Sequence, residues 1–285
     1  MGIGQSWHIN DDLQEGPGLI HLREVRFDLH KQKKDLFPCN LPVFEHLSVL
    51  KFSNPVTLFV GENGSGKSTL LEALALSAGS VAIGSSDLGK DETLNQIQPL
   101  VDKTKLVWHK RIHRGFFLRA EDFFGYVKRN RALRQSLEDD LSGIAREFRE
   151  RSDYARSLAR MPVDSSLKAL ESKYGGDLDE RSHGESFLTL FQSRFVPDGL
   201  YLLDEPEAAL SPVSQLGLIA MIKTMVVQGG QFIIATHSPI LMAIPGAECL
   251  NFDVSPPEPV AYDAIEHVQL YRTFLGAPQA FIEKL

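Results

Sequence analysis

The sequence predicts an α/β protein with a mostly parallel β-sheet, helices flanking the sheet and an inserted helical lobe. Two observations support this fold class. Continuous apolar runs at 56–60, 201–203 and 232–235 have the length and composition of buried parallel strands. Helical patterns separate these runs, and strands that alternate with helices are typical of a parallel sheet covered on both faces.

The composition is that of an ordinary globular protein: 43% of the 285 residues are hydrophobic and 24% are charged. We expect a single domain over 1–285, with the helical lobe inserted at 87–180. The net charge of −7 argues against general binding of polyanions. Cys39 and Cys249 match no metal-binding spacing, and no apolar stretch approaches the roughly 20 residues of a membrane span. A cytoplasmic protein without a leader peptide is expected.

The elements of the N-terminal half follow from local patterns. Residues 18–29 alternate between apolar and polar and predict a half-buried strand, and residues 42–52 predict another extended segment. The strand at 56–60 leads to a helix that closes at 77–80. Residues 84–105 are polar at first and predict a loop, followed by short strands at 106–108 and 116–118.

A long helical region is predicted from about 121 to 160. Apolar residues fall at intervals of four, four, three and four, which places them on one helix face; they are Leu133, Leu137, Leu141, Ile144 and Phe148. Breaks are expected at Met161–Pro162 and at 174–177. After residue 181 we expect a helix, the strand 201–203, a helix at 213–227, the strand 232–235, a proline-rich loop at 254–260 and a terminal helix at 263–275.

The octapeptide at 61–68 reads GENGSGKS and fits the phosphate-loop pattern G-x-x-x-x-G-K-[ST] at every fixed position. It lies between a predicted strand and a predicted helix, where backbone N–H groups and the helix N-terminus can hold an anion. The motif predicts a nucleoside triphosphate with Mg²⁺ as ligands. The residues expected at the nucleotide are Glu62, Asn63, Gly64, Ser65, Gly66, Lys67, Ser68 and Thr69.

Two further strand ends carry polar residues. The apolar run 200–203 ends in Asp204 and Glu205, and the run 232–235 is followed by Thr236 and His237. We expect Ser68 and Asp204 to hold the metal ion, Glu205 to act as general base and His237 to contact the γ-phosphate or the attacking water.

The segment 181–186 reads RSHGES and precedes an apolar helix. By itself it is best interpreted as a capping box, in which Ser182 and Glu185 satisfy the first N–H groups of the helix.

The order of these motifs resembles that of the ABC-type ATPase family: phosphate loop, helical insertion, signature turn, strand-end Asp-Glu and switch histidine. In that resemblance Ser182, Gly184 and Glu185 match three positions of the Leu-Ser-Gly-Gly-Gln signature, while Arg181 and His183 depart from it. The resemblance implies that this turn contacts the nucleotide of a second subunit, so that the active unit is a head-to-tail homodimer.

The family also places a glutamine at a strand end between the phosphate loop and the signature. No glutamine stands at 116–121, and the resemblance leaves Glu121, as a metal contact, or Arg119 as substitutes; Glu121 can equally be the first-turn acid of the following helix. An aromatic residue for stacking on adenine is not singled out, because Phe27 and Phe37 are both candidates and either can belong to the core.

The string DEPEAALSP at 204–212 resembles the soluble branch of the family, which includes small bacterial ATPases, overcoming-lysogenization-defect nucleases and the Rad50, RecF and SMC heads. This implies ATP hydrolysis as a conformational switch at a dimer interface. The alternatives are a regulatory ATPase module of a repair or phage-defence complex that binds nucleic acid or a nuclease, and, less favoured, a transporter motor.

A basic and aromatic cluster at 110–134 has two interpretations: a nucleic-acid surface or an ordinary solvated helix face with buried aromatics. A docking surface for a partner protein is a third. The cluster comprises Lys110, Arg111, Arg114, Arg119, Lys128, Arg129, Arg131 and Arg134 with Phe123, Phe124 and Tyr126.

Overall fold

The structure is a computed structural model that describes residues 19–29, 37–83, 92–174 and 183–283. Its centre is a six-stranded sheet in the order β5-β6-β7-β3-β8-β9. The strands are β5 (Gly115–Arg119), β6 (Leu200–Asp204), β7 (Gln231–Ala235), β3 (Val56–Val60), β8 (Glu248–Asn251) and β9 (Glu258–Val260). All neighbours are parallel except β8 and β9. The predicted α/β class with a mostly parallel sheet is confirmed.

A second, antiparallel sheet has the order β2-β1-β4 and is formed by β1 (Leu22–Phe27), β2 (Val49–Lys51) and β4 (Thr104–Trp108). Gln231 of β7 joins the two sheets: its side-chain Oε1 accepts hydrogen bonds from the backbone N–H groups of His21 and Leu22, and its Nε2 donates to the Leu22 carbonyl. Gln231 is fully buried, and a buried side-chain amide without hydrogen-bond partners would destabilise the folded protein. These three hydrogen bonds remove that cost.

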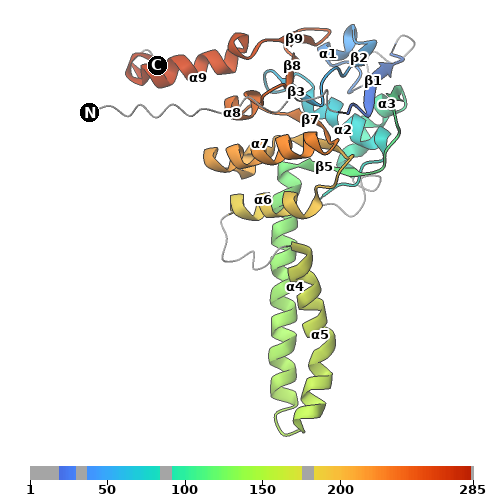
Figure 1. The fold of residues 1–285 in the computed structure, drawn as a ribbon, viewed down its shortest axis with the longest axis vertical. Helices are drawn as coiled ribbons and strands as arrows, with labels where there is room; N and C mark the ends of the chain where they lie inside the picture. Colours follow the sequence, from blue (N-terminus) through green and yellow to red (C-terminus); the bar gives the residue numbers. More distant parts are fainter. Residues whose placement is uncertain (1–18, 30–36, 84–91, 175–182, 284–285) are drawn as a thin grey trace.

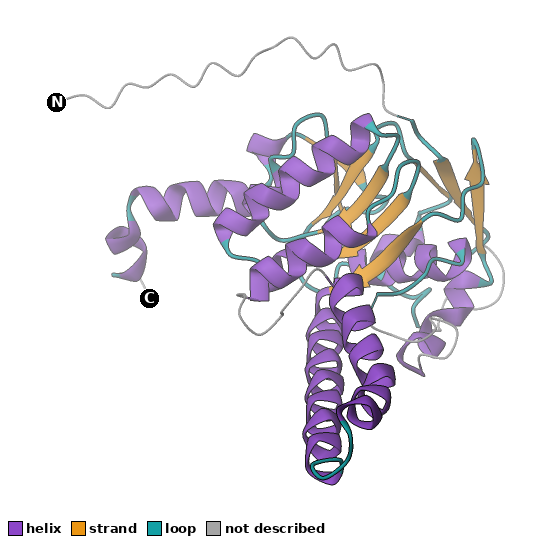
Figure 2. Ribbon diagram, turned by 60° about the horizontal axis from the view of Figure 1, so that its bottom comes forward, coloured by secondary structure: helices purple, strands orange, loops and turns teal. Residues whose placement is uncertain are grey.

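The side chains of the central strands alternate between two apolar layers. One layer contains α2 (Lys67–Ala78), α3 (Gln98–Val101) and the three-stranded sheet; the other contains α6 (His183–Arg194), α7 (Pro212–Val227) and α8 (Pro239–Met242). Figure 2 shows helices on both sides of the strands. Since every residue of β3, β6 and β7 is buried, these strands need the continuous apolar runs from which they were predicted.

Two antiparallel helices, α4 (Ala120–Glu147) and α5 (Asp153–Tyr174), form an arm that projects from the sheet (Figure 1). Phe123 and Val127 anchor the base of α4 in the core. The predicted segment 87–180 thus supplies β4 and β5 to the sheets as well as this helical arm. The expected break at Met161–Pro162 is wrong, because α5 continues through Pro162 and the chain turns at 148–152 instead.

Three other expectations are corrected by local structure. The segment 42–52 begins with the short helix α1 (Pro42–Glu45), which has proline at its first position, before β2. Residues 92–101 form η2 (Glu92–Ile97) and α3 where a loop was predicted, and residues 84–91 lie outside the described residues. The proline-rich segment 254–260 contains β9, an edge strand that tolerates Pro259.

The chain ends with η4 (Tyr262–Ala264), α9 (Glu266–Gly276) and α10 (Pro278–Ile282). The terminal helix therefore starts three residues later than predicted, after a 3₁₀ turn. Within the described residues, no helix has both the length and the apolar content needed to cross a bilayer.

A candidate nucleotide site at the carboxyl edge of the sheet

The phosphate loop connects the carboxyl end of β3 to the N-terminus of α2, as the sequence predicts. Gly66 precedes the helix with φ 97°, a left-handed conformation that favours glycine, and a Cβ at this position would lie 2.7 Å from Val43 Cγ1. Asn63 and Gly64 are exposed, whereas Lys67 is buried. The loop therefore presents its glycine-rich side to solvent at a helix N-terminus, which is the geometry of an anion site.

Lys67 lies inside the curl of this loop. Its Nζ donates to the carbonyl oxygens of Gly61 and Glu62 at 2.8 and 2.7 Å and lies 3.3 Å from Ser65 Oγ. Burial lowers the pKa of Lys67, while the nearby carboxylates, led by Asp253, oppose this effect. The ammonium group is thus held at the place where the phosphates of a nucleotide would meet the loop.

Ser68 and Asp204 meet across the edge of the sheet. Ser68 Oγ donates to Asp204 Oδ1 at 2.9 Å, which joins the first turn of α2 to the end of β6. Burial raises the pKa of Asp204 to about 7, and the hydrogen bond from Ser68 counteracts that rise. A hydroxyl and a carboxylate oxygen suit Mg²⁺, which usually takes few protein ligands and fills its remaining positions with water and substrate phosphate.

The predicted metal ligand Glu121 does not join this pair. It lies in the first turn of α4 with its side chain 77% exposed, and its described ionic contact is with Arg119 at 3.7 Å. Across the described residues, no group of three or more His, Cys, Asp and Glu side chains could hold a metal ion. Ser68 and Asp204 are therefore the protein groups that fit the metal, and Glu121 fits the alternative of a first-turn helix acid.

Arg119 occupies the position at the end of β5 that pairs with Asp204 of β6. Its buried guanidinium contacts Glu72 of α2 at 3.0 Å and Asp122 of α4 at 2.9 Å. Although burial opposes the charged form, the hydrogen bonds and charges of Asp122 and Glu72 raise the pKa of Arg119. Arg119 thus connects the phosphate-loop helix, the central sheet and the arm at one point.

Glu205 and His237 leave neighbouring strands and lie side by side. His237 Nε2 is 3.7 Å from Glu205 Oε1, and the Glu205 side chain is 45% exposed. Glu205 has φ 48°, a left-handed conformation that is uncommon outside glycine and turns the chain from β6 into η3 (Pro206–Ala209). Burial lowers the pKa of His237, and the Lys67 charge adds to this, so a neutral imidazole is favoured.

Two contacts at this edge were missed from the sequence. Asp253, in the loop after β8, accepts the Glu62 N–H with its Oδ1 at 2.7 Å. His267 of α9 places its Nε2 3.2 Å from Glu62 Oε1, and its ring meets that of His237 at a centroid distance of 5.4 Å. Asp253 follows a parallel strand, a signal that could have identified it, whereas the sequence around His267 carries none.

The predicted signature turn is only partly within the described residues. Ser182 lies outside them, and Gly184 and Glu185 belong to the first turn of α6. Their predicted role at a second subunit's nucleotide stays a prediction.

The basic and aromatic cluster is divided by the fold. Arg119 and Phe123 are buried, while Lys110, Lys128 and Arg129 are exposed. The interpretation as an ordinary helix face with buried aromatics is favoured, because the described aromatic residue of the cluster belongs to the core. The adenine candidate Phe27 is likewise buried and packs against Phe44 at a centroid distance of 6.3 Å.

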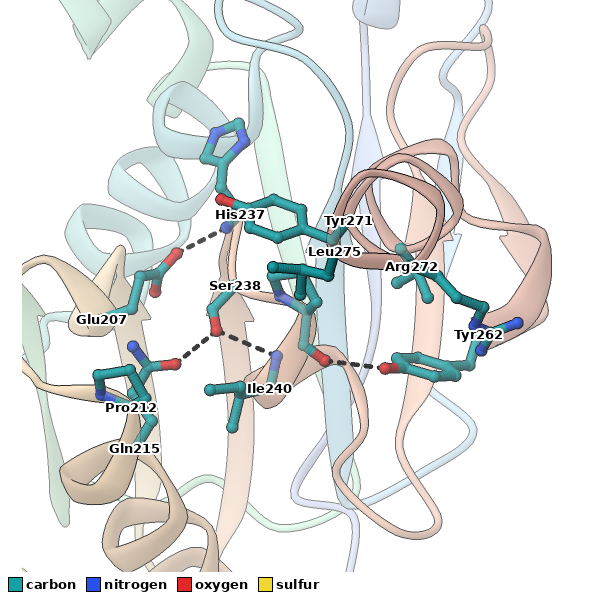
Figure 3. A pocket seen from close by; sticks show the side chains of 12 residues that line it. Glu207, Pro212, Gln215, His237, Ser238, Ile240, Tyr262, Tyr271, Arg272 and Leu275 are labelled. Atoms are coloured by element: carbon teal, nitrogen blue, oxygen red, sulfur yellow. Dashed lines mark hydrogen bonds between the residues drawn. The ribbon is translucent and has the colours of Figure 1, made fainter. Parts of the chain in front are cut away.

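A pocket of about 590 Å³ lies between α7, α8 and α9, and His237 is one of the residues that line it (Figure 3). Glu207 of η3, Gln215 of α7 and Ser238 form its polar part, and the rings of Tyr262 and Tyr271 line its outer wall. The Ser238 hydroxyl contacts Gln215 Oε1 and caps α8. His237 thus borders both the Glu205 side chain and this pocket.

Several known proteins are similar to this chain. A family model described as an AAA domain matches residues 39–102. The cobalt import ATP-binding protein CbiO of Salmonella typhimurium is 29% identical over 202 residues, which covers 70% of this chain and 67% of that protein. Among solved structures, CbiO1 from Clostridium perfringens is similar with 14% identity and a TM-score of 0.44, covering 93% of this chain and 100% of that chain. The SMC head domain from Thermotoga maritima is similar with 16% identity and a TM-score of 0.42, covering 85% and 100%.

The phosphate loop between β3 and α2, with Ser68 against Asp204, defines an ATP-binding P-loop protein. Within that class, the chain is similar to ABC-type ATP-binding proteins, and an AAA-domain model matches its residues 39–102. These similarities agree with the P-loop ATPase resemblance expected from the motif order. The curated relative is an import ATP-binding protein, so the less favoured transporter branch is also represented among the similar proteins.

Proposed function

We propose that this protein hydrolyses ATP with Mg²⁺ and uses the reaction as a conformational switch at a head-to-tail homodimer interface. The observation that carries the proposal is the convergence of Lys67, Ser68, Asp204, Glu205 and His237 at the carboxyl ends of three parallel strands. In open parallel sheets, ligands bind at this edge.

Each residue has a role that its surroundings support. Lys67 and the loop amides bind the phosphates, and Ser68 with Asp204 holds Mg²⁺, which supplies charge neutralisation at the phosphates when bound. The Glu205 side chain is 45% exposed, so a water can reach its carboxylate and give up a proton to it. His237, held neutral by burial, can donate a hydrogen bond to a γ-phosphate oxygen.

The dimer is proposed because the outer side of the site is open. Asn63 and Gly64 are exposed, and nearly half of the Glu205 side chain faces solvent. A second protomer that covers this side would exclude water from the reacting phosphate and add its own α6 N-terminus with Gly184 and Glu185.

Replacing the proposed general base tests both the assigned hydrolysis chemistry and the ATP-dependent dimer. We expect Glu205→Gln to lower the rate of phosphate release by at least about a hundredfold, because general base catalysis contributes about 10²–10⁴-fold. The variant should still bind ATP and elute as a dimer with ATP and Mg²⁺. Steady-state phosphate release, fluorescent-nucleotide titration and gel filtration measure these outcomes.

Glu258→Gln, on the exposed edge strand β9, is the matched control and should behave as wild type. Undiminished hydrolysis by Glu205→Gln would contradict the assigned base. A monomer at every ATP concentration would contradict the dimer while leaving ATP binding intact.

A further inference from the structure

Glu207 makes two hydrogen bonds that hold the turn at Thr236 and His237, directly after β7. Its Oε1 accepts the His237 backbone N–H at 2.6 Å (Figure 3). The same oxygen accepts the Thr236 hydroxyl at 2.8 Å. The turn that presents the His237 imidazole is therefore bonded to η3 and not only to its own strand.

The same turn is bonded on its other side to α7. Thr236 Oγ1 also accepts the Ser238 N–H at 3.0 Å, and Ser238 in turn contacts Gln215. Gln215 Nε2 donates to the Leu210 carbonyl at the end of η3. Glu207 thus belongs to a closed set of hydrogen bonds that joins the exits of β6 and β7 to the start of α7.

The backbone of one short turn also fixes the position of Glu207 relative to Glu205. Both belong to one 3₁₀ turn, in which the Ala208 N–H donates to the Glu205 carbonyl at 3.0 Å. The sheet already ties the two strand exits through the Glu205 N–H, which donates to the Ala235 carbonyl at 2.9 Å. The Glu207 bonds extend this tie past the strand end to Thr236 and His237, and Nε2 of His237 lies 3.7 Å from Glu205 Oε1. A positioned pair must be held to within a fraction of an ångström to act on the same water and phosphate.

We propose that Glu207 is a positioning residue that holds the His237 imidazole in register with Glu205 through the Thr236–His237 turn. The inference rests on the proposed ATP hydrolysis for its kinetic consequence, but its geometric part concerns this chain's own hydrogen bonds. A carboxylate or an amide oxygen at position 207 satisfies both donors, and a methyl group satisfies neither.

The kinetic test compares Glu207→Ala, Glu207→Gln, His237→Ala and the double variant Glu207→Ala/His237→Ala. We expect Glu207→Ala to lower kcat at least about tenfold with the KM for ATP within about threefold, since the phosphate loop is untouched. Glu207→Gln should stay within about threefold of wild type. The double variant should be no slower than His237→Ala alone, because residues that act as a unit are non-additive.

A purely structural role predicts a different pattern. Multiplying losses in the double variant would overturn the proposal, as would a Glu207→Gln variant as slow as Glu207→Ala. Should Glu207→Ala not fold, Thr236→Val replaces it: this variant removes one of the two donors and should show a smaller fall in kcat, again without a further loss on the His237→Ala background.

Hydrogen exchange of segment 236–241 separates the inference from the proposed function. The His237 amide should exchange at least about tenfold faster in Glu207→Ala than in wild type, and at nearly the wild-type rate in Glu207→Gln. Equal exchange in wild type and Glu207→Ala would overturn the positioning role. A wild-type protein that binds but does not hydrolyse ATP would contradict the proposed function, and the exchange result would still decide the role of Glu207.

Discussion

Single buried charges organise the carboxyl edge of the sheet. The Arg119 guanidinium lies among the carboxylates of Glu72, Glu121 and Asp122, and its strand pairs with that of Asp204. Burial raises the pKa of Glu72, and the charge of Arg119 opposes this rise. The buried Arg119 charge thus allows the Glu72 carboxylate to lie close to Asp204 without a large loss of folding stability.

Replacing this cation with an apolar side chain of similar length should therefore be strongly destabilising. We expect Arg119→Met to lower the free energy of unfolding by about 3 kcal/mol or more, because it leaves buried carboxylates uncompensated. Without Arg119 the folded-state pKa of Glu72 should rise further above its unfolded value. The folded state then binds more protons, so stability should fall as pH rises above the ordinary pKa of a glutamate.

Urea unfolding at pH 5 and pH 8 measures both effects, and the loss should be larger at pH 8. Arg26→Met is the control: Arg26 is 57% exposed and pairs with Glu24 at the surface, so about 0–1 kcal/mol is expected at either pH. Similar losses for the two variants, or a loss that does not depend on pH, would contradict the role of Arg119.

The helical arm shows that packing between two helices can keep a proline inside a helix, although proline locally favours a helix break. Pro162 lies within α5, although proline removes a backbone donor and clashes with the preceding turn. The exposed proline stays in the helix because α5 packs along α4. Packing along a partner helix supplies the stability that local propensity lacks.

Replacing Pro162 with alanine should stabilise the arm. The expected gain reaches up to about 3 kcal/mol for α5, because the helix recovers an N–H donor and loses a clash. Hydrogen exchange of residues 153–170 should slow markedly. Ser165→Ala, at an exposed neighbouring position, should change exchange only slightly. Unchanged exchange in Pro162→Ala would show that the proline does not weaken this helix.

At the scale of the whole molecule, the arm is set apart from the nucleotide edge. Figure 1 shows α4 and α5 projecting away from the sheet, and within the described residues no side chain from 131 to 170 is buried. The arm therefore adds little to the core that positions Lys67 and Asp204. Its base at Phe123, Val127 and Arg119 belongs to the core and links the arm to the site.

Removing the distal arm should consequently leave nucleotide binding intact. We expect a protein in which a short Gly-Ser linker replaces residues 131–170 to bind ATP with a Kd within about threefold of the full chain. Isothermal titration with ATP and Mg²⁺ measures this outcome. Loss of ATP binding by a variant with an unchanged circular dichroism thermal transition would show that the distal arm contributes to the site.

Local patterns were sufficient for the strands β3, β6 and β7, the phosphate loop at 61–68 and the polar residues at the strand ends. These features depend on apolar runs, glycine conformations and the rule that parallel strands share one carboxyl edge. The same reasoning failed for Pro162 and for the segment 42–52, where packing against distant elements decided the conformation. It also proposed Glu121 as a metal contact, although that side chain faces solvent.

The sequence by itself determined that the chain is a nucleotide-binding α/β protein and which strand ends carry its chemistry. The tertiary structure alone decided that Gln231 joins the two sheets, that His267 meets Glu62 and that Glu207 holds the His237 turn. These contacts join residues that are far apart in the chain or that lie on different strand exits. No local pattern specifies them, because they form only when packing brings those exits and the C-terminal helix to one edge of the sheet.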